Sequence, residues 1–186
     1  MFTLLAALCG SKVIAVDAQS GFKEVIEKNV NNNGCSEKVN FVSGIVGANS
    51  GVVSDPFKHK SASHHIDKTP EISFPEIISR FNLKRIDFLK VDIKGSEFAL
   101  FSDNNEWLSL VDKIAMEVHP EFGDVKSLGA LLAKKGFDVW YVNKNQQIVD
   151  ELITQGFLFA KNLHSFELQK DESKKNSSHC RNFNLK

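Results

Sequence analysis

One short run of the sequence ends in side chains that could do acid–base chemistry. Residues 86–92 begin as an apolar, β-branched and aromatic stretch, which predicts a strand buried in a parallel sheet. Lys90 and Asp92 are two residues apart and therefore share one face of that strand. Gly95 permits a tight turn, and a helix carrying Glu97 is expected to follow. This order of strand, acid, turn and helix is how open α/β sheets present ligand-binding residues.

A second strand-like run, residues 113–119, places Glu117 and His119 on one face at its carboxyl end. Histidine is the side chain best suited to general base catalysis near neutral pH. If the two strands are parallel neighbours, Asp92 and His119 come together as a catalytic pair. The structural alternative is that Lys90 forms a buried ion pair with Glu117, and that His119 only caps a turn before Pro120.

A third acid, Asp17, follows the strand-like run Val13–Val16. A carboxylate at the tip of such a strand can accept hydrogen bonds from both hydroxyls of a ribose. The alternative reading of Asp17 is the N-terminal cap of the next helix, because aspartate is among the preferred capping residues.

Composition excludes several classes of partner. Hydrophobic residues make up 42% of the 186 residues, and the 23 basic and 23 acidic residues give zero net charge, which argues against a nucleic-acid partner. We expect no membrane span, because no stretch approaches the roughly 18 apolar residues that one requires. His59, His64, His65 and Asp67 match no known metal cage, so no metal is predicted. The cysteines are predicted to be free thiols, with Cys9 packed inside.

Strand-like and helix-like segments alternate along the chain, which predicts an α/β fold with a mostly parallel, doubly wound sheet. The last strand-like segments lie close together and predict antiparallel strands at the end of the sheet. We expect one domain over residues 1–168 and a polar, disordered tail over residues 169–186. The expected helices span 2–9, 20–33, 74–81, 96–102 and 124–135, and the expected strands span 13–16, 39–46, 86–92, 113–119, 137–142, 148–149 and 157–160. A turn and a possible strand partner are expected at 47–53.

The order of these pieces resembles the FkbM-type methyltransferases, a branch of the class I enzymes that use S-adenosylmethionine. Residues 86–97 resemble the family signature Leu-Lys-x-Asp-x-Glu-Gly-x-Glu, and the flanking similarities lie at residues 13–17, 29–33, 114–119 and 156–161. Lys94 stands where the family usually has glutamate. Family members also open with a strand and an Asp-x-Gly-x-Asn-x-Gly loop, which the sequence before Phe2 lacks. We therefore expect an N-terminally truncated sheet, with either a gap between the strands that lead to Asp17 and Asp92 or a closure of these two strands onto each other.

The resemblance implies S-adenosylmethionine as cofactor and methylation of a hydroxyl group on a small-molecule or glycan-like acceptor. It implies catalytic roles for Asp92 and His119, and cofactor-binding roles for Asp17, Glu97 and Glu117. The alternative is a non-catalytic, truncated methyltransferase-like domain, which is a fragment or a remnant that binds a partner.

Overall fold

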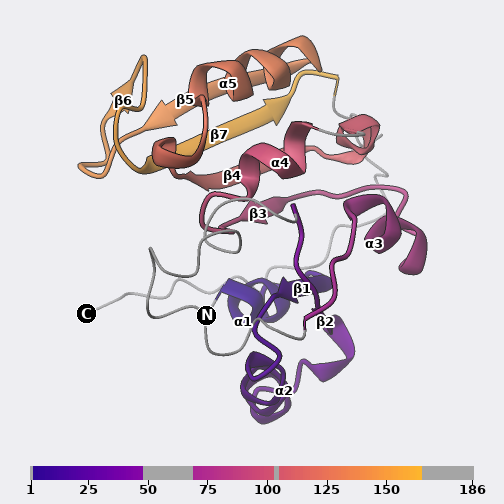
Figure 1. Ribbon diagram of the computed structural model, residues 1–186. Coiled ribbons are helices and arrows are strands. Elements are labelled where there is room, and N and C mark those ends of the chain that lie inside the picture. The colour runs from indigo at the N-terminus through magenta and orange to yellow at the C-terminus, as the bar shows by residue number, and fades with distance from the viewer. Residues whose placement is uncertain (1, 48–68, 103–104, 165–186) are drawn as a thin grey trace, which may run out of the picture.

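The computed structural model describes residues 2–47, 69–102 and 105–164. These residues form helices and strands, and the strands are arranged in two sheets (Figure 1). One sheet has two strands in the order β1-β2, and the other has five in the order β3-β4-β7-β5-β6. The helices are α1 Phe2–Leu8, α2 Phe22–Asn32, α3 Phe74–Arg80, α4 Glu97–Ser102 and α5 Val125–Lys134. The strands are β1 Val13–Asp17, β2 Val39–Ser43, β3 Leu89–Val91, β4 Lys113–Val118, β5 Phe137–Val142, β6 Ile148–Val149 and β7 Gly156–Asn162.

The first unit of the chain is the two-stranded sheet with α1 and α2. Strands β1 and β2 are parallel, and Val13 lies opposite Val39. Gly10, at φ +95°, ends the first helix in the left-handed region that glycine adopts without strain. The small core of this unit consists of Ala7, Val30 and Cys35.

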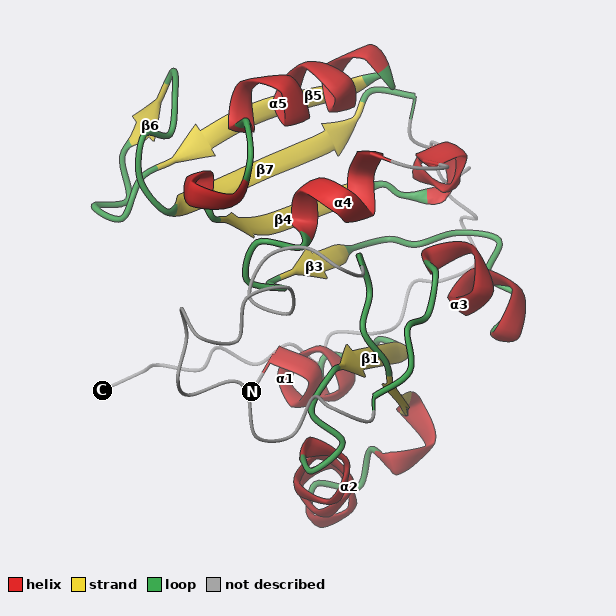
Figure 2. Ribbon diagram, in the orientation of Figure 1, coloured by secondary structure: helices red, strands yellow, loops and turns green. Residues whose placement is uncertain are grey.

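The second unit is the five-stranded sheet and the helices packed on it (Figure 2). Strand β3 is parallel to β4, whereas β7 runs antiparallel to both β4 and β5. Its core includes the fully buried Phe101 of α4, Leu132 of α5 and Met116 of β4. Helix α3 begins with a capping box between Ser73 and Glu76, and Phe74 packs on Trp107 with ring centroids 4.1 Å apart.

The described residues directly after β2 approach the start of α4. Gly47 has φ +74°, and a Cβ placed there would lie 2.5 Å from the carbonyl oxygen of Ser96. Only glycine allows this backbone to approach the start of α4 so closely. The two units therefore meet beside the strand ends that the sequence marks as a site.

Strands β1 and β3 are not hydrogen-bonded to each other. Each is paired on one side only among the described residues, β1 with β2 and β3 with β4. Of the two arrangements expected from the sequence, the gap is therefore present and the closure is not.

The expected helices and strands are present, with differences at some ends. The strand expected over 86–92 is shorter, because only Leu89–Val91 forms a ladder with β4 and Ile86 makes an isolated bridge to Val111. It is also less buried than expected, since Phe88 is 48% exposed. The expectation for Cys9 is wrong: Cys9 is exposed, and Cys35 is the buried thiol.

Two expectations concern segments that the structure does not describe. The strand partner expected near residue 52 and the disordered tail expected over 169–186 both lie outside the described residues. Within the described ranges, no helix has the length and apolar character needed to cross a bilayer.

Candidate functional site

The first part of the site is the turn that leads from β3 into α4. Asp92 follows the last residue of β3, and the chain then turns through Lys94 and Gly95, which have φ values of +52° and +101°. A positive φ is uncommon for a lysine and directs its side chain differently from a continuing strand. As a result, the Lys94 ammonium (Nζ) lies 2.9 Å from Asp92 Oδ1 and 3.2 Å from Glu117 Oε2.

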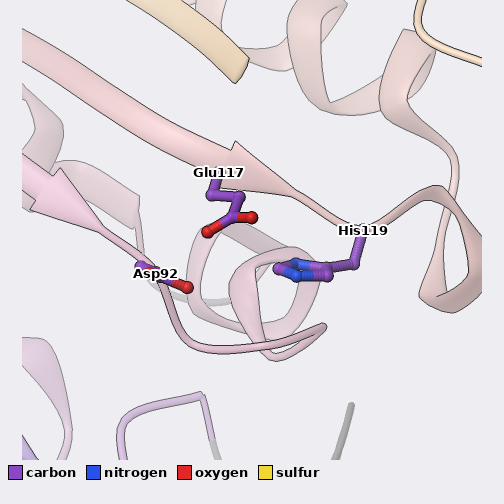
Figure 3. Close-up of side chains that lie close together, drawn as sticks. All are labelled: Asp92, Glu117 and His119. Carbon is purple, nitrogen blue, oxygen red and sulfur yellow. The ribbon is translucent and has the colours of Figure 1, made fainter. Parts of the chain in front are cut away.

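The second part of the site is the carboxyl end of β4. The parallel register sets Val91 opposite Met116, so the residues that follow, Asp92 and Glu117, come to the same edge of the sheet. His119 lies just beyond the strand and turns back toward them (Figure 3). One ligating atom each from Asp92, Glu117 and His119 lies within 4.8 Å of the other two. Asp92 and His119 therefore meet at the ends of neighbouring parallel strands, which is the adjacency that favours the functional reading of His119.

Glu97 supports the site through hydrogen bonds from a buried position. Its side chain is completely buried, and its Oε1 accepts hydrogen bonds from the backbone N–H of His119 at 2.8 Å and from the His119 ring at Nδ1, 3.0 Å away. Its Oε2 accepts the backbone N–H of Gly95 at 2.7 Å. A buried carboxylate needs such donors, and here they fix both the turn and the imidazole. With Nδ1 held as a donor, the lone pair of His119 lies on Nε2.

The charges of the cluster shift its pKa values in definite directions. Burial raises the pKa of Asp92, but the hydrogen bond and charge of Lys94, together with the charge of Lys90, outweigh burial and leave this pKa below its ordinary value. Burial lowers the pKa of His119, but the hydrogen bond and charge of Glu97 leave it above its ordinary value. Asp92 is therefore a weakly basic carboxylate, and His119 is the stronger base.

Asp17 lies at the carboxyl end of β1, on the other unit. Its Oδ1 accepts the backbone N–H of Gln19 at 2.8 Å, and no described residue donates to its Oδ2. Burial raises the pKa of Asp17, the Gln19 hydrogen bond lowers it, and the negative charge of Asp92 raises it further. The carboxylates of Asp17 and Asp92 therefore interact electrostatically across the gap between β1 and β3. A half-buried carboxylate with one uncommitted oxygen matches the acceptor pattern of a ribose diol.

The structure decides some of the alternatives left open by the sequence. The residue that pairs with Glu117 is Lys94, whereas Lys90 lies 3.9 Å from Asp92 Oδ2. Asp17 bonds the N–H of Gln19, two residues on, and the first residue of α2 has no side-chain cap. The cofactor-binding roles of Asp17, Glu97 and Glu117 stay predictions, as do the catalytic roles of Asp92 and His119.

Sequence reasoning missed one residue of the site. The amide Nε2 of Gln155 donates to Glu117 Oε1 and lies 3.4 Å from His119 Nε2. Gln155 directly precedes β7, whose first residue, Gly156, lies opposite Val118 at the end of β4. The antiparallel register of β4 with β7 would have located Gln155. The residue pattern within one strand does not reveal its register with another strand.

The chain is similar to known methyltransferases. The family model described as the methyltransferase FkbM domain matches residues 2–158. A relative from Beauveria bassiana (strain ARSEF 2860), named Methyltransferase 1, is 38% identical over 60 residues. That match covers 31% of this chain and 24% of the relative, so it spans about a quarter of the relative's length.

Two solved structures resemble the fold. The METTL16 MTase domain superposes with a TM-score of 0.54 at 15% identity, covering 87% of this chain and 55% of that one. The human methyltransferase 10 domain containing protein gives a TM-score of 0.49 at 15% identity, with coverages of 88% and 66%. The chain spans about half the length of the first structure, and that likeness supports the class I methyltransferase fold expected from the sequence.

Proposed function

This chain belongs to the FkbM methyltransferase family, and we propose that it moves a methyl group from S-adenosylmethionine to a hydroxyl group of an acceptor. The observation that carries the proposal is the convergence of Asp92, Glu117 and His119 within 4.8 Å at the carboxyl ends of two parallel strands. Open α/β sheets bind their ligands at this edge. Asp17 lies at the carboxyl end of β1 in the neighbouring unit, and the negative charge of Asp92 raises the pKa of Asp17.

The proposed cofactor fits the residues present. Asp17 would hold the ribose of S-adenosylmethionine, because its Oδ2 accepts no hydrogen bond from the described residues. When bound, the cofactor supplies an electrophilic methyl group on a sulfonium. Binding and orientation are then the main tasks of the protein, because the alignment of acceptor and methyl group supplies much of the rate enhancement.

His119 is the proposed base that takes the proton of the acceptor hydroxyl. Its Nε2 carries the lone pair, because Nδ1 is bonded to Glu97. The hydroxyl proton of the acceptor would move to Nε2, and the cofactor would supply the methyl group that the acceptor oxygen takes up. Proton removal by a positioned base contributes roughly 100- to 10,000-fold in typical cases.

Asp92 and Glu97 support this transfer in different ways. Asp92 is ionised and held by Lys94, so its lowered pKa makes it the weaker of the two candidate bases. We place it beside the acceptor, where its oxygens accept hydrogen bonds. Glu97 has no exposed surface, so we assign it as a positioning residue for His119.

The acceptor is proposed as a small-molecule or glycan-like hydroxyl compound. Neither Asp92 nor Glu117 is fully buried, with side chains 40% and 18% exposed, so an acceptor can reach the cluster from solvent. Carboxylates are good acceptors for sugar hydroxyls, because each oxygen offers two lone pairs.

The experiment is a transfer assay with S-adenosylmethionine and a panel of sugars and other alcohols, following formation of S-adenosylhomocysteine. We expect His119→Ala to lower turnover at least about 100-fold. His164→Ala is the matched control, because His164 is exposed and its backbone bonds Asn162 away from the cluster. Equal turnover of His119→Ala and wild type would overturn the assignment of the base. Absence of turnover with every acceptor, together with absence of cofactor binding, would favour the non-catalytic alternative.

A further inference from the structure

We propose that Asp92, Glu117 and His119 form a binding site for a divalent transition-metal ion, and that the ammonium group of Lys94 competes with the ion for this position. The inference goes beyond methyl transfer, because metal binding needs neither cofactor nor acceptor.

The donor atoms are close to the separations that one ion requires. A first-row divalent ion lies about 2.0–2.2 Å from carboxylate oxygen and imidazole nitrogen, so its ligand atoms are roughly 3–4.4 Å apart. In the structure the three ligand atoms lie within 4.8 Å of one another, and the side chains converge from two strand ends (Figure 3). Shifts of a few tenths of an ångström bring them onto one ion.

His119 is held as metal-binding histidines are held. Such a histidine usually donates its second ring N–H to a carboxylate, which fixes the tautomer and the direction of the ring. Glu97 has this relation to His119 Nδ1 at 3.0 Å, and both side chains are almost completely buried. The remaining nitrogen, Nε2, lies 3.4 Å from the side-chain amide of Gln155, which also donates to Glu117.

Glu117 is also supported from outside the cluster. The amide of Gln155 donates to Glu117 Oε1, and Lys94 contacts Oε2. Ligating carboxylates are commonly oriented by such hydrogen bonds. The Glu117 carboxylate is therefore already directed toward Asp92 and His119.

A cation already lies against the two carboxylates. The Lys94 Nζ atom is 2.9 Å from Asp92 and 3.2 Å from Glu117, so it partly balances their two negative charges. A second lysine, Lys90, lies 3.9 Å from Asp92 and belongs to no bridge with Glu117. Because the Lys94 side chain is 51% exposed, it can swing into solvent when an ion binds.

The donor set selects a class of ion. One imidazole with two carboxylates suits Mn²⁺, Fe²⁺, Co²⁺ or Zn²⁺ better than Ca²⁺, which prefers six to eight oxygen ligands. A bound ion would use the same Nε2 lone pair as the proposed base, so metal binding should inhibit transfer. That last consequence rests on the proposed function, whereas binding itself does not.

The test is a titration of the full chain with Mn²⁺, following the electron paramagnetic resonance signal of the free ion, without cofactor. We expect one site, and we expect Lys94→Gln to bind Mn²⁺ roughly tenfold more tightly than wild type. Lys90→Gln is the matched control, because it removes the same charge near Asp92 without opening the bridge. It should change the affinity less than about threefold.

Two further variants identify the ligands. Adding Glu117→Gln or His119→Gln to the Lys94→Gln chain should weaken Mn²⁺ binding by about 10- to 100-fold, and circular dichroism checks that each variant is folded. Two variants are used so that a loss of folding in one leaves the other decisive. The proposal is overturned if Lys94→Gln binds no better than Lys90→Gln, if neither ligand variant weakens binding, or if no chain binds Mn²⁺. If the chain binds Mn²⁺ as expected but transfers no methyl group, the result would count against the proposed function and leave the proposed metal site standing.

Discussion

The unit that carries β1 and β2 and the unit that carries the five-stranded sheet differ in how much apolar surface they bury. Among the described residues, the buried core cluster of the first unit has three members, whereas that of the second has sixteen. Several large side chains of the first unit stay exposed, namely Phe2, Leu5, Leu8, Phe22 and Val25. Buried apolar area is the main source of folding free energy, so the five-stranded unit should be the more stable of the two.

This difference separates the proposed chemistry from the proposed ribose contact. Asp92, Glu97, Glu117 and His119 are placed by β3, β4 and α4, next to the large core. Asp17 is placed by β1, in the unit with the small core. A site that must hold a base to within a fraction of an ångström gains from rigid elements. The ribose contact needs less precision, so a less stable unit can supply it.

The largest expected effect is on the large core. Phe101 is completely buried against Trp107, with ring centroids 5.5 Å apart. Phe101→Ala should lower the free energy of unfolding by about 3–5 kcal/mol, measured by urea denaturation, because it leaves a cavity that neighbours cannot fill.

A matched pair of substitutions sharpens this comparison. Val111 lies in the large core at 1% exposure and Val30 in the small one at 4%. Val111→Ala should cost roughly 1 kcal/mol more than Val30→Ala, since the looser surroundings of Val30 can close the space. Equal costs, or a larger cost for Val30→Ala, would show that the two units are equally well packed.

The second effect concerns the buried carboxylate of the site. Glu97→Gln keeps the shape of the side chain but places an NH₂ group toward donors that now bond a carboxylate oxygen. We expect a loss of roughly 2–3 kcal/mol in unfolding free energy, because hydrogen bonds to a charged group are the strong ones. Thermal denaturation measures this loss. A variant as stable as wild type would mean that Glu97 does not hold the turn and the imidazole together.

The third effect separates chemistry from stability. The ion pairs of Asp92 with Lys94 and Lys90 are solvent-exposed, so Asp92→Asn should change the free energy of unfolding by less than about 1 kcal/mol. Turnover should nevertheless be lost, because the carboxylate beside the acceptor is removed. Retained activity in a strongly destabilised variant would make Asp92 a structural residue.

The smallest expected effect is an increase in the free energy of unfolding. The pKa of Asp17 is raised in the folded chain, chiefly by burial, so the folded protein holds this proton more tightly than the unfolded one does. Ionisation of Asp17 therefore lowers stability as the pH rises from the ordinary value of 3.8 through the folded pKa, and the cost is complete above that pKa. Asp17→Asn should be slightly more stable than wild type at pH 7.

This gain should fade as the pH falls through 3.8 and be absent well below that value, where Asp17 is protonated in both states. Melting temperatures of both chains across pH measure the difference. Asp138→Asn, which changes an exposed acid on β5, is the matched control. A stability difference that does not depend on pH would contradict the burial argument.

Strand periodicity in the sequence predicted the positions of site residues within the strands. It did not predict the contacts made by residues in the turn that follows β3. Period-two spacing correctly placed Lys90 near Asp92, and the structure meets the condition of adjacent strand ends on which the functional reading of His119 depended. The periodicity could not show that Lys94, at φ +52°, turns back to bridge Asp92 and Glu117. That contact depends on the conformation of one turn, which residue types do not determine.

Tertiary pairing explains the remaining differences. Gln155 reaches Glu117 because β7 runs antiparallel to β4, and complete burial of Glu97 depends on how α4 packs. The strand expected over 86–92 is short, and among the described residues β3 pairs with β4 alone. These features depend on segments distant in sequence, so local patterns do not contain them.

We propose that the two units form one site for S-adenosylmethionine, with Asp17 on one side and the Asp92 cluster on the other. Isothermal titration calorimetry of the wild-type chain and of Asp17→Asn with S-adenosylmethionine measures whether both units take part in binding. We predict binding to wild type and about 10- to 100-fold weaker binding to Asp17→Asn, the effect of losing hydrogen bonds to a charged group. Absence of heat with wild type at millimolar cofactor, or equal affinity of the two chains, would contradict the claim.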